Sequence, residues 1–86
     1  MVKDIKEAKF VIWYDNESTT QQIEYEEMME IISDCPSIPC IVVPAKPLEG
    51  QSDNIELQNV KSKNKFRGKK AIEELRNEVN IIMKQN

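Results

Sequence analysis

The sequence predicts a small α/β domain (on the border with α+β) in which two amphipathic helices cover a three- or four-stranded mixed sheet. Three observations lead to this prediction. Two short apolar runs, at 10–14 and 38–43, are separated by one helical segment. A third run alternates apolar and polar residues, and an amphipathic segment closes the chain. The expected order is therefore strand, helix, strand, strand, helix, and 86 residues are enough for a single domain over 1–86.

The first apolar run, 10–14, consists of five consecutive β-branched or aromatic residues, Phe-Val-Ile-Trp-Tyr. A short run of this kind is typical of a strand that is buried on both faces and central in its sheet. The second run, 38–43, has the same character. Because one helix connects them, we expect a right-handed parallel crossover.

The first helix is predicted from about Thr20 to Asp34. Both Ser18-x-x-Gln21 and Thr19-x-x-Gln22 match a capping box just before it. At helical spacing, four apolar residues fall on one side and predict the buried stripe: Tyr25, Met28, Met29 and Ile32. Acidic residues occupy the opposite side.

Ile23 lies among those acidic residues, away from the predicted stripe. One interpretation is a solvated acidic face that carries a single stray apolar residue. The other is an acidic docking face with an apolar centre, formed by Ile23, Glu26, Glu27 and Glu30. Both interpretations are consistent with the sequence.

The remaining segments complete the predicted fold. Residues 44–53 are rich in turn formers and predict a long loop, and 54–60 predict an edge or near-edge strand. Phe66 either closes a hairpin with that strand or lies in a plain connection. The last helix is predicted over Lys69–Lys84, with a buried stripe of Ile72, Leu75, Val79, Ile82 and Met83.

Charge is distributed very unevenly along the chain, whose net charge is −3. Residues 1–60 hold four Lys and twelve acids, a net of −8, whereas residues 61–86 hold eight Lys or Arg and three Glu, a net of +5. Such a split indicates either a charged partner or the pairing of two copies, acidic helix against basic stretch.

The basic stretch 61–70 is a candidate partner- or anion-binding site. Its cations gather around the start of the last helix, where backbone amides attract anions, and Phe66 is available to stack on a base or to fill a partner's pocket. The alternative is a solvated connection that offsets the acidic helix within the same molecule. The residues of this candidate site are Lys61, Lys63, Lys65, Phe66, Arg67, Lys69 and Lys70.

Several classes of chemistry find no support in the sequence. The absence of histidine removes the commonest general base and metal ligand, so we expect no enzyme, no metal and no cofactor. Cys35 and Cys40 have neither zinc-site nor redox spacing and are expected to be reduced and structural. Asp15–Thr20 follows a strand, where α/β folds bind ligands, but without the glycines of a phosphate loop a helix cap is the simpler interpretation.

The predicted function is a non-enzymatic protein-binding module, a small regulator, inhibitor or adaptor that acts on a larger partner through charged surfaces. The alternative is a nucleic-acid-binding protein that uses 61–70. The acidic first sixty residues favour the first, since dedicated nucleic-acid binders are usually basic. With no signal-like start and no apolar run of about 20 residues, we expect a cytoplasmic protein without membrane contact.

Overall fold

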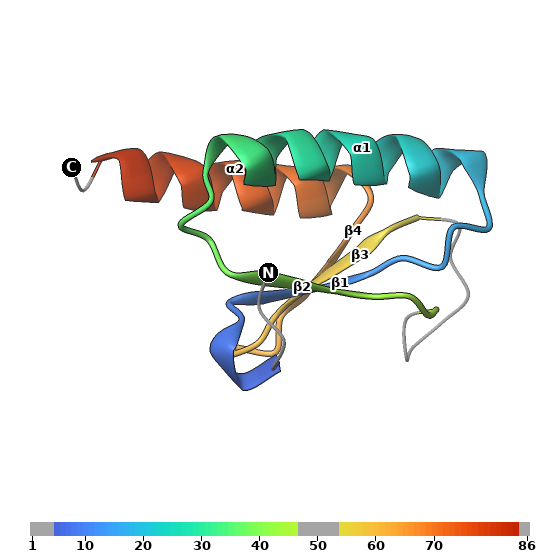
Figure 1. The fold of residues 1–86 in the computed structure, drawn as a ribbon, viewed down its shortest axis with the longest axis horizontal. Helices are drawn as coiled ribbons and strands as arrows, with labels where there is room; N and C mark the ends of the chain where they lie inside the picture. The colour runs from blue at the N-terminus through green and yellow to red at the C-terminus, as the bar shows by residue number, and fades with distance from the viewer. Residues whose placement is uncertain (1–4, 47–53, 85–86) are drawn as a thin grey trace.

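The computed structural model describes residues 5–46 and 54–84 of the chain. A short 3₁₀ turn precedes a four-stranded sheet and two α-helices (Figure 1). The elements in chain order are η1 (Ile5–Glu7), β1 (Phe10–Trp13), α1 (Thr19–Asp34), β2 (Cys40–Val43), β3 (Glu56–Asn59), β4 (Lys65–Arg67) and α2 (Lys69–Lys84).

The sheet is mixed and has the strand order β2-β1-β3-β4. β1 pairs with β2 in parallel, Phe10 opposite Cys40, and with β3 antiparallel, Ile12 opposite Leu57. β3 and β4 form an antiparallel hairpin in which Leu57 faces Phe66. The predicted α/β class, the central first strand and the parallel crossover are confirmed, and Phe66 does close a hairpin.

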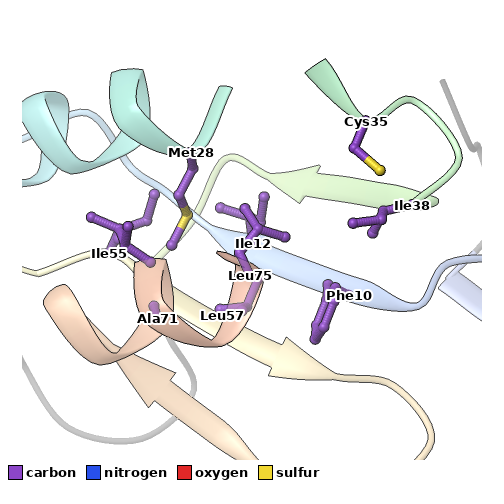
Figure 2. Close-up of a cluster of buried hydrophobic side chains, with 10 residues drawn as sticks. Phe10, Ile12, Met28, Cys35, Ile38, Ile55, Leu57, Ala71 and Leu75 are labelled. Atoms are coloured by element: carbon purple, nitrogen blue, oxygen red, sulfur yellow. The ribbon is translucent and has the colours of Figure 1, made fainter. Parts of the chain in front are cut away.

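Both helices lie on the same side of the sheet, with η1 on the other side (Figure 1). Alternation along β1 places Phe10 and Ile12 toward the helices and Val11 and Trp13 away from them. Figure 2 shows Met28 of α1 and Leu75 of α2 converging with the strand side chains. The buried core between the layers consists of Phe10, Ile12, Met28, Cys35, Ile38, Ile55, Leu57, Ala71, Ile72 and Leu75.

β2 differs from its expected place. Its sequence resembles that of β1, yet it lies at the edge of the sheet, and all four of its residues are only half-buried. The reason is topological, because among the described residues only β1 pairs with it. A strand that was expected to be buried on both faces therefore presents one free edge.

α1 is rotated relative to the predicted stripe. Its fully buried residues are Gln21, Glu24 and Met28, whereas Tyr25 and Met29 from the predicted stripe are half-buried at its margin. At helical spacing Gln21 falls on the predicted apolar side and Glu24 just beside it, and the apolar pattern marked neither of these polar residues as buried. Both have hydrogen-bond partners that make this burial favourable, as described below.

The bounds of α2 agree with the prediction, and Ile72 and Leu75 are buried as expected. Met83 was expected to be buried, but it is 66% exposed. The cause is visible in Figure 1, where the C-terminal turns of α2 extend beyond the sheet. Residues 47–53 of the predicted long loop lie outside the described residues.

Candidate functional site

The start of α1 is a closed set of hydrogen bonds. Ser18 caps the helix, and its Oγ accepts from the Gln21 N–H at 3.0 Å. The buried Gln21 side chain turns back, and its Oε1 accepts from the backbone N–H groups of Asp15 and Asn16 at 3.1 and 2.9 Å. Ser18-x-x-Gln21 therefore holds the preceding loop in addition to capping the helix. Within that loop, Asp15 Oδ1 accepts from the Glu17 N–H and Asn16 Oδ1 accepts from the Tyr14 hydroxyl.

Glu24 is a buried carboxylate that joins α1 to the sheet. Its Oε1 accepts from the Ile55 N–H at 2.9 Å, and its Oε2 accepts from Asn54 Nδ2 at 3.0 Å. Gly68 packs closely against this group, with φ of +57°, and a Cβ there would lie 2.9 Å from both Asn54 Nδ2 and Glu24 Oε2. The cluster is structural, and the sequence offers no signal for it except that Glu24 lies between Gln21 and Met28 on one helical face.

The predicted acidic face of α1 is divided into two flanks. One flank faces α2 across a groove of about 400 Å³ in which Ile23, 55% exposed, lies near Glu27. Lys69, from the predicted basic stretch, lines the same groove. The full lining is Thr20, Ile23, Glu24, Glu27, Lys69, Ile72, Glu73 and Arg76. Charges of both signs therefore meet on this side of the helix.

The other flank of α1 is uniformly acidic. A groove of about 670 Å³ runs along it and is lined by Tyr25, Glu26, Met29, Glu30, Ser33 and Asp34, with no basic residue among them. The Tyr25 ring stacks on Tyr14, with ring centroids 4.0 Å apart and planes 7° from parallel. Desolvation, followed by the negative charges of Tyr25, Glu26 and Asp15, raises the pKa of Tyr14 above its usual value.

The residues of the predicted basic site lie on three different parts of the fold. Lys61 and Lys63 are exposed in the β3–β4 turn, whereas Lys69 and Lys70 are exposed in the first turn of α2. Lys65 and Arg67 lie between these two places on β4, and alternation turns their side chains away from the helices. Six cations that lie within ten residues of sequence are thus distributed over a turn, a sheet face and a helix start.

Phe66 is half-buried and packs against the hydrophobic core. Its neighbours on β4 point to the opposite face, as expected for successive strand residues. A nucleic-acid base or a partner's pocket would have to compete with this packing for the ring.

The sheet face away from the helices contains a buried carboxylate that the sequence does not reveal. Glu56 is only 1% exposed, lies opposite both Trp13 and Arg67, and its Oε1 accepts from Arg67 Nε at 3.1 Å. Its Oε2 and the Trp13 Nε1 are buried without a hydrogen-bond partner. This central charge holds Arg67 close to the sheet.

Cys35 is buried and Cys40 is half-buried, and both are free thiols. Burial raises the pKa of Cys40 to about 11, which suppresses its thiolate at neutral pH. Within 5–46 and 54–84, no group of three or more His, Cys, Asp or Glu residues is placed to hold a metal ion. In the same residues, no helix has the length and apolar character needed to cross a membrane.

Compared with models of protein families, with curated proteins and with solved structures, the chain has no match. The functional interpretation therefore depends on the geometry and charge of its own surfaces.

Proposed function

We propose that this chain is a non-enzymatic protein-binding module, a small regulator, inhibitor or adaptor that docks on a larger partner through the exposed acidic face of α1. One observation carries the proposal. α1 contains no basic residue, four of its five acids are exposed, and the 55% exposed Ile23 lies beside them. An apolar centre with a charged rim is typical of protein interfaces.

The spacing of these acids supports the proposal. Glu26 and Glu30, and likewise Glu30 and Asp34, are four residues apart and repel each other by roughly 0.2–0.5 kcal/mol per pair on an exposed helix. No base within α1 relieves this repulsion. A cationic partner surface would relieve it, so binding gains electrostatic free energy that the isolated chain lacks.

The nucleic-acid alternative has weaker support from the described surface. Backbone recognition needs a continuous basic track, whereas the cations of 61–70 are divided among three places, and Phe66 packs inward. The acidic face of α1 would also repel a long polyanion that approaches so small a domain.

Affinity capture from extracts of the cells that make the protein tests the proposal. We expect the double variant Glu26→Lys/Glu30→Lys to lose the captured partner, while Asn80→Lys, at an exposed position of α2 outside the groove that contains Ile23, retains it. A partner that is lost with Lys69→Glu/Lys70→Glu but retained by the α1 double variant would place the interface on the basic stretch. A gel shift with nucleic acid at 0.15 M salt that disappears with the Lys changes would replace the proposal with its alternative.

Pairing of two copies, acidic face against basic stretch, is a further expectation from the charge split. Light scattering at low and high salt tests it, because screening weakens such pairing. A mass that stays monomeric at low salt and high protein concentration would exclude it.

A further inference from the structure

The free edge of β2 exposes a short row of backbone hydrogen-bonding groups. The carbonyls of Pro39 and Val43 face β1, since they accept from the N–H groups of Lys9 at 2.7 Å and Tyr14 at 3.1 Å. Backbone groups alternate in direction along a strand. Cys40 and Val42 therefore turn their N–H and C=O groups outward, away from β1.

This row of outward donors ends abruptly on both sides. The Ile38 N–H is already bonded to the Cys35 carbonyl at 3.3 Å. Pro44 has no N–H, although its position in the alternation would direct one outward. Within the described residues, the edge thus presents two outward donors, from Cys40 and Val42.

The acidic flank of α1 lies on the same side as this edge. α2 packs against β4 and against one side of α1, so the other side of α1 faces the β2 end of the sheet (Figure 1). That side is the groove lined by Glu26, Glu30 and Asp34, with Tyr25 and Met29 as its apolar floor. A strand added to β2 would extend beneath this flank.

The spacing of charges on the helix matches that of side chains on a strand. Glu26, Glu30 and Asp34 are four residues apart, which corresponds to about 6 Å along a helix. Alternate side chains of a strand are about 6.6 Å apart and point to the same face. A strand with a basic residue at every second position therefore places its cations in register with these carboxylates.

We infer that the β2 edge accepts an extended basic segment of a partner protein as an added strand. Its Lys or Arg side chains lie beneath Glu26, Glu30 and Asp34, and its intervening apolar side chains lie beside Ile41 and Val43. This inference rests on the proposed protein-binding function and names the partner's chemistry. A second copy fits less well, since antiparallel pairing of two β2 edges brings two acidic flanks together.

A synthetic hexapeptide of alternating Lys and Val, acetylated and amidated at its ends, is a direct probe. Titrated into the full ¹⁵N-labelled chain, it should shift the amide signals of Cys40 and Val42 most strongly. Methyl groups on the backbone nitrogens of either the Lys residues or the Val residues block one edge of the peptide at a time, so one of these two peptides should bind at least tenfold more weakly. A peptide with Glu in place of Lys should also bind at least tenfold more weakly. These controls test the backbone bonds and the charge separately without altering the protein.

Matched variants of α1 identify the carboxylates that attract the basic peptide. Glu26→Gln/Glu30→Gln should weaken peptide binding about tenfold or more, while Glu27→Gln, on the flank that faces α2, should leave it unchanged. If Glu27→Gln weakens peptide binding as much as the double variant does, strand addition at this edge is wrong. It is also wrong if the peptides methylated at the backbone nitrogens of Lys and of Val both bind as tightly as the unmethylated peptide. Cys40 and Val42 signals that shift on protein concentration alone would also overturn it, since a second copy would then be the occupant.

The two proposals fail in different ways. If cellular capture depends on Glu26 and Glu30 but the peptide leaves Cys40 and Val42 unshifted, α1 binds its partner without strand addition. If the peptide shifts both signals but capture is independent of α1, the edge binds basic strands and the proposed docking on α1 is wrong.

Discussion

α1 and α2 have the same length, 16 residues, and both pack on the same side of the sheet, but α1 adds buried polar bonds to this apolar packing. α2 buries a simple apolar stripe that includes Ile72 and Leu75. α1 buries Gln21 and Glu24 with Met28, and leaves Ile23 exposed. Both helices therefore complete the core, and α1 is anchored in addition by the hydrogen bonds of its buried Gln21 and Glu24 side chains.

The largest expected loss of stability comes from removing a buried apolar side chain of α2. Leu75→Ala should lower the free energy of unfolding by about 2–4 kcal/mol, because it leaves a cavity in a fully buried site. Met83→Ala, in the exposed last turn, should change it by less than about 0.5 kcal/mol. Urea denaturation of both variants checks this, and similar losses for the two would mean that α2 faces the sheet differently.

Removing a polar anchor from α1 should have the next largest effect. Glu24→Ala should cost about 1–3 kcal/mol, because the buried Ile55 N–H loses its acceptor. Glu27→Ala, three residues along on an exposed position, is the matched control and should be nearly neutral. If Glu24→Ala melts like the wild type, then packing alone holds α1 to the sheet.

The N-terminal cap of α1 should contribute less. Ser18→Ala removes the acceptor of the Gln21 N–H and should cost about 1 kcal/mol. Ser18→Asp retains an acceptor at the cap and should recover most of that loss. Thermal unfolding resolves the difference, and equal destabilisation by both variants would show that the hydroxyl acts through some other contact.

The reactivity of the Cys40 thiol reports how well this part of the edge strand is shielded by its packing against the core, and measuring it does not require a change in stability. With its pKa raised to about 11, its thiolate fraction at pH 8 is about 100-fold lower than at the ordinary value of 9.0. Alkylation by iodoacetamide should be slower by a similar factor and should accelerate as the pH rises toward 11. Peptide-resolved mass spectrometry follows the rate, and alkylation as fast as that of a free thiol would contradict this shielding.

The sequence predicts those parts of the fold whose packing is local and apolar. The bounds of α2 follow from the helical spacing of Ile72 and Leu75, and β1 follows from its unbroken apolar run. The rotation of α1 does not follow, because the bond that buries Glu24 joins it to Ile55, 31 residues away. Helical periodicity cannot reveal a partner so distant in the chain.

The candidate surfaces were less predictable than the elements that carry them. β1 and β2 look alike in sequence, and only strand pairing decides which becomes central. The cations of 61–70 are close together in sequence, but they lie on a turn, a strand and a helix start. The acidic face was recognised from α1 alone, whereas its division into two flanks depends on where α2 and β2 lie.

The abrupt ends of the outward donor row on β2 also bear on aggregation. Open sheet edges can template the growth of fibrils when they offer a long, flat and apolar row of unpaired backbone groups. In the described part of this edge the Ile38 N–H is occupied and Pro44 has none, so an incoming chain finds outward donors only on Cys40 and Val42. An edge of this length can hold one short segment, and we expect it to be too short to seed an extended β-structure.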